Sequence, residues 1–279
     1  MKIITIIENK SKRETLIAQY GLSLLVEANG KRILVDVGQD EATYTNFLAL
    51  NLDPSTIDAI VLSHNHFDHV GGLHSFLEVT GNAPVYASHA ADNTELYTKK
   101  PFRKKKLASR NELLAECGDR LVRVNDQAEI FDGIYACTIK SPDPDFACKD
   151  KKLKKKLPTG RLGADTFEHE IYLAIIENNT LSIISSCSHN GIVNIINDAQ
   201  ARFGMPVSSF IGGLHTRGSS AKGLNCSRKY LDTVIDKLNE LSLKSIYTCH
   251  CTGGKAYGIF RQGLKFKIKY FSTGDTINI

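Results

Sequence analysis

Residues 61–72 read VLSHNHFDHVGG, and this stretch places His64, His66, Asp68 and His69 within six positions, directly after an apolar run. The chain has nine histidines in 279 residues, so a third of them lie here. Chance is a poor explanation for an H-x-H-x-D-H pattern. Neutral imidazole and carboxylate are ligands that zinc, manganese and iron accept. The stretch therefore predicts a metal site at the end of a buried strand.

The number of candidate ligands in this loop favours two metal ions. Four candidates within six residues are more than one tetrahedral ion takes from so short a loop, so the economical solution is two neighbouring ions with two loop ligands each. We expect two divalent ions, zinc foremost, with manganese and iron as alternatives. Gly71 and Gly72 follow the motif and would let the backbone pass close beneath such a site.

The same pattern of an apolar strand that ends in a histidine recurs three times. It is found in LSIISSCSHNG (181–191), SSFIGGLHT (208–216) and SIYTCHCTGG (245–254). The ends of such strands converge at one edge of a sheet. We therefore expect His189, His215 and His250 on the same rim as His64 and His66.

The order of expected elements predicts one α/β domain over residues 1–279. GLSLLVEANGKRILVDVG (21–38) is typical of a β-hairpin that turns at Asn29-Gly30. Each half of the chain runs from hairpins into strand–helix units, which indicates two packed sheets with helices outside. An irregular basic insertion is expected around residues 97–165, with a mobile loop at SPDPDFACKDKKLKKKLPTG (141–160).

The composition indicates a soluble, cytoplasmic protein. With 42% apolar residues the chain can bury a substantial core. No window approaches eighteen apolar residues, and the start MKIITIIENKSKRE does not read as a signal peptide, so no membrane association is expected. Seven cysteines are an odd number without the short spacing of a disulfide framework, which favours reduced thiols. The mixed surface permits a homodimer.

Positive charge is concentrated in two runs. They are KKPFRKKK (99–106) and KDKKLKKKLPTGR (149–161), in a chain whose net charge is only +5. One interpretation is that both are solvated loops. The other is that they attract an anionic substrate or nucleic acid.

The motifs resemble a known family, the metallo-β-lactamase fold hydrolases, whose HxHxDH signature follows a short strand in the N-terminal half. The resemblance covers nearly the whole chain. More narrowly, GLSLLVEANGKRILVDVG, SCSHNGIVNII, IGGLH and CHCTG look like the branch of 7,8-dihydropterin-6-methyl-4-(β-D-ribofuranosyl)aminobenzene 5′-phosphate synthase-like proteins. The fold that this resemblance implies is an αβ/βα four-layer sandwich of two mixed sheets flanked by helices, with the metals at one edge of the sheets.

The resemblance also implies how the ligands are shared. His64 and His66 would bind one metal, completed by His189. Asp68 and His69 would bind the other, completed by His250.

One feature departs from the family pattern. Most hydrolases of this fold bridge their two metals with an aspartate in a Gly-Asp pair, and SSCSHNG (185–191) occupies the expected place. Cys187, as a thiolate, could substitute for it. Alternatively, His189 sits at that position and His169, in TFEHE (166–170), takes the place of the preceding ligand. The sequence leaves both arrangements open.

Two adjacent metals predict hydrolytic chemistry, because a shared water loses its proton near neutral pH and a metal stabilises the developing oxyanion. Asp68 is then both a ligand and a catalytic proton acceptor, and His215 is a second candidate catalytic residue. The narrower resemblance suggests a small phosphorylated or pterin-like substrate. The substrate-binding candidates are Lys104, Lys105, Lys106 and Lys255, with the lysines of 151–156 also suited to a phosphate.

Two other functions stay open. A nuclease or phosphodiesterase of the same fold would use the same metals, but the basic runs lack interleaved aromatic residues, so a nucleic-acid partner is not expected. A non-hydrolytic iron redox protein is the second alternative. No flavin-binding domain follows, which weakens it.

Overall fold

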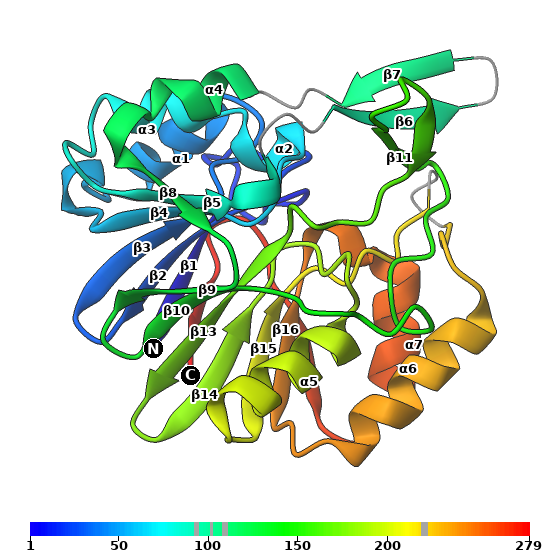
Figure 1. Ribbon diagram of the computed structural model, residues 1–279. Coiled ribbons are helices and arrows are strands. Elements are labelled where there is room, and N and C mark those ends of the chain that lie inside the picture. The colour runs from blue at the N-terminus through cyan, green and yellow to red at the C-terminus, as the bar shows by residue number, and fades with distance from the viewer. Residues whose placement is uncertain (92–94, 101–102, 108–110, 219–222) are drawn as a thin grey trace.

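The computed structural model describes residues 1–98, 114–218 and 223–279 except 92–94, and of residues 99–113 it describes only the backbone of 99–100, 103–107 and 111–113. The predicted lysine run 104–106 thus has a described backbone, while its side chains lie outside the described residues. Within this part of the chain the strands form two sheets of seven strands and a smaller sheet of four. Figure 1 shows the two large sheets stacked with helices outside them.

The first large sheet has the order β18-β1-β2-β3-β4-β5-β8. Its strands are β1 (Lys2–Ile7), β2 (Ser23–Ala28), β3 (Lys31–Val35), β4 (Ala59–Leu62), β5 (Val85–Ser88), β8 (Leu121–Val124) and β18 (Thr276–Asn278). The predicted hairpin is confirmed, since β2 and β3 pair antiparallel around Asn29 and Gly30, which both have positive φ. The strands from β3 to β8 are parallel.

The second large sheet has the order β17-β16-β15-β14-β13-β10-β9. Its strands are β9 (Gln127–Phe131), β10 (Ile134–Thr138), β13 (Ile171–Glu177), β14 (Thr180–Ile184), β15 (Val207–Gly212), β16 (Ser245–Thr248) and β17 (Lys267–Tyr270). The strands from β14 to β17 are parallel, and β9, β10, β13 and β14 are antiparallel neighbours.

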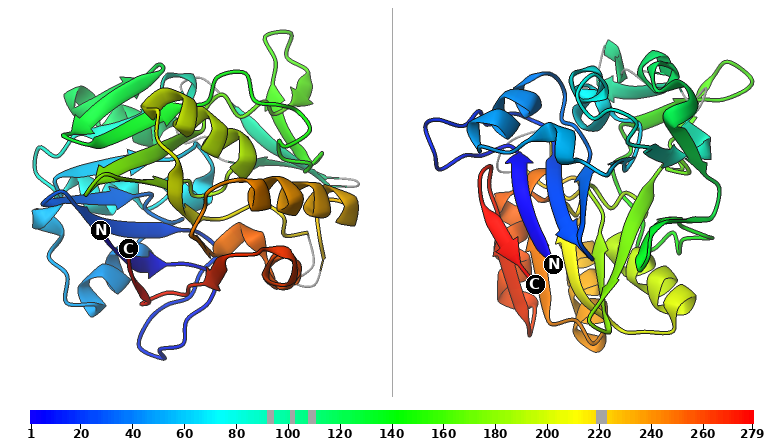
Figure 2. Two further views of the ribbon diagram at one scale, coloured as in Figure 1. Left: turned by 90° about the horizontal axis from the view of Figure 1, so that it is seen from below. Right: turned by 90° about the vertical axis from the view of Figure 1, so that its left-hand side faces the viewer.

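Helices cover the outer face of each large sheet, as all three views show (Figures 1 and 2). The first sheet carries α1 (Ala42–Ala49), α2 (Phe67–Val70), α3 (Leu73–Leu77) and α4 (Asn111–Glu116), and the second carries α5 (Ile192–Phe203), α6 (Arg228–Glu240) and α7 (Gly254–Gly263). Short 3₁₀ turns lie at Pro54–Thr56, His89–Ala91, Gly118–Arg120 and His250–Thr252.

Three apolar cores separate the four layers. One lies between the sheets and includes Val26 and Val35 of the first with Leu173 and Ile211 of the second. A second core packs the helices α5, α6 and α7 against the second sheet, and a third packs α1 and α3 against the first. The αβ/βα sandwich that the sequence predicted is confirmed. Since apolar burial drives folding, these cores fix the sheet edges relative to each other.

The smaller sheet lies in the region where the sequence predicted an irregular insertion. It joins β6 (Leu96–Lys100), β7 (Arg103–Leu107), β11 (Leu153–Lys156) and β12 (Leu162–Ala164) in the order β12-β11-β6-β7. Two strands therefore lie within the stretch 141–164, of which most was expected to be a loop. Consecutive lysines in KKLKKK carry no apolar alternation, so the period of a strand is hidden there.

The parallel pairing brings several strand ends to one edge of the sandwich. The ends of β4, β14, β15 and β16 are followed by His64, His189, His215 and His250 respectively. The prediction that these histidines share one rim depends on where these four strands end. In the described part of the chain, no helix has the length and apolar character needed to cross a bilayer.

Candidate metal centre

The loop after β4 is held tightly against the turn after β3. A side-chain carbon at Gly71 would lie 2.0 Å from the Gln39 carbonyl oxygen, and one at Gly72 would lie 2.3 Å from the Val37 carbonyl oxygen. Only glycine fits such an approach. The close passage of the backbone predicted from the two glycines is therefore present, and it fixes the loop that carries the histidines.

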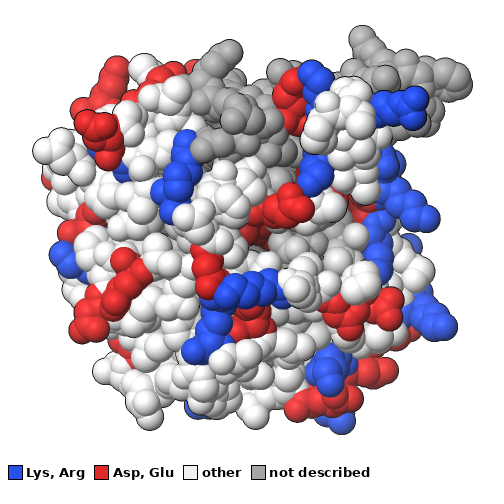
Figure 3. All heavy atoms as spheres, viewed as in Figure 1, with Lys and Arg blue, Asp and Glu red and all other residues white. Residues whose placement is uncertain are grey.

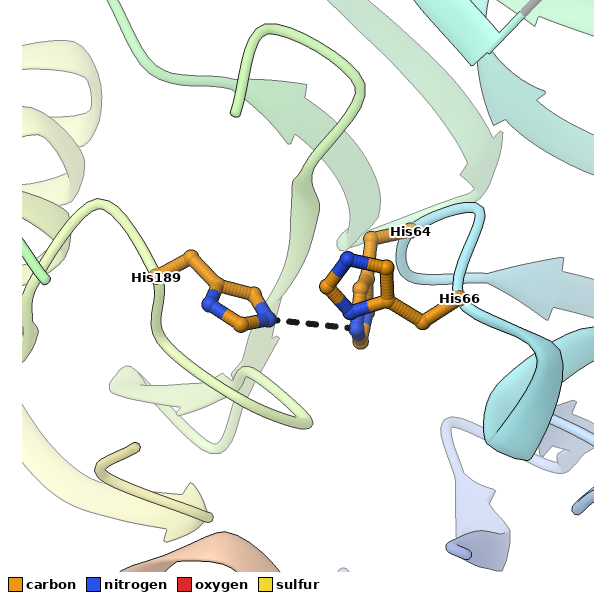
Figure 4. Close-up of side chains that lie close together, drawn as sticks. All are labelled: His64, His66 and His189. Atoms are coloured by element: carbon orange, nitrogen blue, oxygen red, sulfur yellow. Dashed lines mark hydrogen bonds between the residues drawn. The ribbon is translucent and has the colours of Figure 1, made fainter. Parts of the chain in front are cut away.

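The first cluster of ligand groups joins this loop to the loop after β14. His64, His66 and His189 are 1%, 6% and 0% exposed, and their rings point toward one another (Figure 4). The Nε2 atoms of His64 and His189 are 3.3 Å apart, and one ring nitrogen of each of the three residues lies within 4.8 Å of the others. These distances suit three ligands around one ion.

The hydrogen bonds of His64 fix which nitrogen is free. Its Nδ1 lies 2.8 Å from Ser63 Oγ, and that hydroxyl donates to Asp36 Oδ2 over 2.7 Å. Nδ1 of His64 must then be the donor, which leaves a lone pair on Nε2 facing His189. Two ring nitrogens at this distance need a shared proton or a cation between them, and a cation accommodates the third histidine as well.

The second cluster, formed by Asp68, His69 and His250, lies beside the first. Asp68 Oδ2 is 3.5 Å from His69 Nε2 and 3.4 Å from His250 Nε2. Cys187 Sγ is 3.3 Å from His69 Nε2, and the ligand atoms of His64, His69 and Cys187 lie within 4.8 Å of one another. The Cys187 sulfur therefore lies next to ligand atoms of both clusters. A ligand that bridges two metal ions would occupy such a position.

The outer nitrogens of the second cluster are also engaged. His69 Nδ1 is 2.6 Å from Asp36 Oδ2, and His250 Nδ1 is 2.9 Å from Asn9 Oδ1. The Asn9 amide also donates to the His250 carbonyl oxygen over 3.1 Å, which sets its orientation. Partners of this kind orient the rings of metal-binding histidines and leave Nε2 as the ligand atom.

The charges of the two clusters differ. Burial, reinforced by neighbouring imidazoles, lowers the pKa of His64 and His189 well below the ordinary value and that of His66 to about 3. Burial opposes ionisation of Asp68, but His69 and His250 outweigh it and hold its pKa well below the usual range. The first cluster is thus neutral, and the second carries a carboxylate.

The donor set fits metal ions. Among the described residues, the buried atoms His66 Nε2, His189 Nδ1 and His250 Nε2 have no hydrogen-bond partner. An unpaired polar atom in the interior is costly, so most such atoms in folded proteins find a partner. Cations that bind these imidazoles would supply it for His66 and His250.

The loop that carries His189 is fixed by two neighbours. Glu170, 1% exposed, accepts hydrogen bonds from the backbone N–H groups of His189 and Asn190 over 2.7 and 2.8 Å. The Phe167 ring stacks on the His189 imidazole with centroids 4.4 Å apart and an interplanar angle of 6°. Neither residue was singled out from the sequence, because both act only through a fold that brings β13 next to β14.

His169, the alternative ligand predicted from the sequence, has both ring nitrogens engaged. Nε2 is 3.2 Å from Asp165 Oδ2, and Nδ1 accepts the backbone N–H of Asn65 over 3.3 Å. It lies near His66 together with Asp165. The geometry favours Cys187 over His169 as the substitute for the usual aspartate, and this assignment stays a prediction.

The other predicted site residues lie at different distances from the clusters. The His215 ring is 4.1 Å from that of His189, measured between centroids. Lys255 is exposed near the start of α7. In the second basic run, Lys155 pairs with Glu168 and Lys156 with Glu95, so these two amines are partly neutralised. Their proposed phosphate contacts remain predictions.

Tyr20 is a residue that sequence reasoning missed. Its ring packs on His250 with centroids 5.0 Å apart, and the Arg217 guanidinium lies 5.7 Å from the ring centroid. The residue as a whole is 46% exposed. Burial raises the pKa of Tyr20, and the negative charge of Asp68 raises it further. Tyr20 therefore lies beside the metal-binding groups while part of the residue stays open to solvent. An exposed tyrosine in an irregular segment gives no sequence signal of this kind.

Comparison with known proteins identifies the family. The model of the metallo-beta-lactamase superfamily matches residues 17–147. The chain is 32% identical over 271 residues to 7,8-dihydropterin-6-methyl-4-(beta-D-ribofuranosyl)-aminobenzene-5′-phosphate synthase of Methanocaldococcus jannaschii, covering 93% of this chain and 90% of the relative. The chain belongs to the metallo-beta-lactamase superfamily. Within it, the chain falls in the branch of this synthase, as the sequence predicted.

Two further comparisons bear on fold and local sequence. A crystal structure described as Tm1679, a metal-dependent hydrolase of the beta-lactamase superfamily, superposes with a TM-score of 0.82 at 25% identity, covering 100% of this chain and 99% of the other. A ribonuclease of Thermus thermophilus is 38% identical over 72 residues, which are 25% of this chain and 17% of the ribonuclease. The similar proteins thus differ in the reactions that their names describe.

Proposed function

We propose that this protein is a metal-dependent enzyme that holds two divalent cations, with zinc as the first candidate, and acts on a small phosphorylated or pterin-like metabolite. The convergence of His64, His66 and His189 beside Asp68, His69 and His250 carries this proposal. The relative named as a pterin-linked phosphate synthase supports the substrate class.

Each cluster would hold one cation. His64, His66 and His189 offer three neutral imidazoles, which suit zinc, manganese or iron. Asp68, His69 and His250 offer a carboxylate and two imidazoles, with Cys187 as the ligand near both positions. Bound cations would lower the pKa of a coordinated water and polarise a phosphoryl or carbonyl oxygen.

The residues around the cations have separate tasks. Asp36 and Asn9 orient two of the histidines through hydrogen bonds. Asp68 is ionised at neutral pH because its pKa is low, which makes it a strong ligand and a weak base. The catalytic roles of Asp68 and His215 as proton acceptors stay proposals, and a measured pH–rate profile would separate them.

Tyr20 and Arg217 suggest how the substrate is held. The ring of a half-exposed tyrosine beside the metal site offers a face on which a flat heterocycle can stack. The neighbouring guanidinium can pair with a phosphate through two parallel hydrogen bonds. Together they match a metabolite that carries both groups, and the lysines at 104–106 would add positive charge.

The proposal has two forms. A hydrolase would break a bond of the substrate with water, whereas a synthase would form a new bond in the product. The sequence predicted a hydrolase, whereas the similar protein of Methanocaldococcus jannaschii is named a synthase. A nuclease finds less support, because the match to the ribonuclease covers a quarter of the chain. On the face seen in Figure 3, the described acidic and basic side chains are interspersed.

The test begins with elemental analysis of protein purified without added metal, alongside Cys187→Ser and His189→Ala. We expect about two equivalents of zinc, manganese or iron, with loss of metal in both variants. The intact protein is then assayed with a panel of phosphate esters and dihydropterins. One equivalent or less, unchanged in the variants, would contradict the dinuclear site. Full metal content without turnover on any member of the panel would contradict the substrate class.

A further inference from the structure

A third group of ligand atoms lies next to the two clusters. One ligand atom each of Cys187, His215 and Cys251 lies within 4.8 Å of the other two. The residues follow three neighbouring parallel strands, β14, β15 and β16, so the second sheet alone positions them. Cys187 also adjoins the second cluster, Cys251 directly follows His250 in the chain, and the His215 ring lies 4.1 Å from that of His189, so this group borders both clusters.

The His215 imidazole has no hydrogen-bond partner within the described part of the chain. Among the described residues, neither ring nitrogen of His215 makes a hydrogen bond, although both are buried. The nearest carboxylate oxygen that pairs with it, Asp150 Oδ2, is 3.8 Å from Nε2. A ring nitrogen of His215 also lies within 4.8 Å of Cys148 Sγ and of a nitrogen of His189, so the imidazole has further potential ligand groups as neighbours.

The thiol of Cys251 is held in place by the backbone. The N–H of His215 donates to Cys251 Sγ over 3.3 Å, and Sγ lies 3.7 Å from the Cys187 carbonyl oxygen. A side-chain carbon at Gly213 would lie 2.4 Å from this sulfur. His215 itself has a φ of 41°, a conformation that costs a non-glycine residue energy. The fold therefore keeps His215 in an unfavourable conformation, and a glycine at position 213, next to the sulfur of Cys251.

The residue types at this group favour a cation. Two cysteine sulfurs and one imidazole nitrogen lie within 4.8 Å of one another. Thiolate with imidazole is the ligand set of thiophilic metals.

We propose that Cys187, His215 and Cys251 form a third metal position that takes a thiophilic cation such as zinc or copper(I). Cys187 is the ligand shared with the neighbouring pair of cations, and Cys148 with Asp150 lies at the outer side of His215. Binding releases a proton from each coordinating thiol and from the imidazole where these are protonated, and no oxidant or reductant is needed. The position adjoins the two-cation site of the proposed function through Cys187, and a cation there would make His215 a ligand and not a proton acceptor.

Cadmium is a suitable probe, because its bonds to thiolate sulfur absorb in the ultraviolet and its imidazole bonds do not. The full-length protein, stripped of metal and kept under reductant, is titrated with cadmium, and bound metal is counted by elemental analysis. Cys251→Ser keeps the size of the side chain and its hydrogen bonds. Cys117→Ser, at a buried cysteine beside α4, is the matched control. His66→Ala tests the neighbouring site independently.

We expect the native protein and Cys117→Ser to bind one more equivalent of cadmium than Cys251→Ser. Cys251→Ser should also lose roughly half of the sulfur–cadmium absorption, since Cys187 remains. His66→Ala should bind less cadmium but keep the full absorption. His215→Ala should lose the same equivalent as Cys251→Ser. Equal cadmium content and equal absorption in the native protein and Cys251→Ser, with unchanged thermal unfolding, would overturn the third position and leave the proposed function intact.

Discussion

The His69 imidazole donates its Nδ1 hydrogen to Asp36 over 2.6 Å, and both side chains are fully buried. Asp36 also accepts from the hydroxyl and the backbone N–H of Ser63 over 2.7 Å each. Through Ser63 it orients His64, so one carboxylate fixes a ligand in each cluster. The Asp36 residue has a φ of 57°, which shows that the chain maintains an unfavourable conformation to place it.

Asp36→Asn is expected to weaken metal binding by about 10- to 100-fold, because the amide holds His69 less firmly and lowers its basicity. Competition with a fluorescent zinc chelator measures the affinity. Ser63→Ala should affect the first cluster more than the second, since it removes only the contact with His64. Unchanged affinity in Asp36→Asn would show that packing alone orients these rings.

Glu170→Gln should weaken the first cation selectively. The carboxylate accepts three hydrogen bonds from His189 and Asn190, and an amide in its place directs N–H groups at donors. We expect the affinity of one of the two cations to fall on the order of tenfold, and that of the other to stay the same. Stepwise metal release followed calorimetrically distinguishes them. An equal loss of both would mean that the mutation disturbs the sheet edge as a whole.

His66→Ala and Asp68→Ala should remove metal and activity while the fold persists. His66 immediately precedes α2 and Asp68 lies in its first turn, at the edge of the sheet and outside the three apolar cores. His66→Ala is expected to lose the first cation and Asp68→Ala the second. Elemental analysis and far-ultraviolet circular dichroism measure the two effects. Retention of full metal content in both variants would contradict the ligand assignment.

The convergence of the candidate ligands could be predicted in large part from the sequence, because these residues follow the ends of strands. His64, His189 and His250 could be placed together from the pattern alone, since parallel strand ends meet at one edge. Asp36, Asn9 and Glu170 could not, because their roles depend on hydrogen bonds between segments far apart in the chain. A carboxylate that orients a histidine looks in the sequence like any other acidic residue.

The strands β11 and β12 show the same limit for the fold. A run of lysines in β11 hides the alternation that marks a strand, and its partner β6 precedes it by more than fifty residues. Pairing between distant segments is decided by the tertiary structure and not by local propensity. The large sheets were predictable because their strands are apolar and their hairpins carry turn residues such as Asn29-Gly30.

Neutralising Lys104, Lys105 and Lys106 together with glutamine is expected to raise KM for a phosphorylated substrate several-fold and to leave kcat nearly unchanged. A remote positive charge stabilises the ground and transition states alike, so its loss weakens binding without slowing the chemical step. Steady-state kinetics at low ionic strength measure both constants, because salt screens such charges. The same substitutions at Lys244, Lys265 and Lys269, which are exposed and have no assigned role in the site, are the control. An unchanged KM would mean that these three lysines form a solvated surface and do not contribute to substrate binding.

Tyr20 and Arg217 should divide substrate recognition between them. Tyr20→Leu keeps an apolar side chain but removes the ring, and the loss of a stacking contact of about 0.5–1.5 kcal/mol corresponds to a rise in KM of roughly two- to tenfold for a pterin substrate. Arg217→Met keeps the length of the side chain and removes the charge, so KM for phosphorylated substrates should rise while that for their dephosphorylated forms stays the same. Tyr44→Leu, at a tyrosine that packs on Phe76 instead, is the control for the loss of a ring. Equal effects of Arg217→Met on both substrate forms would show that this guanidinium supports Tyr20 and does not bind phosphate.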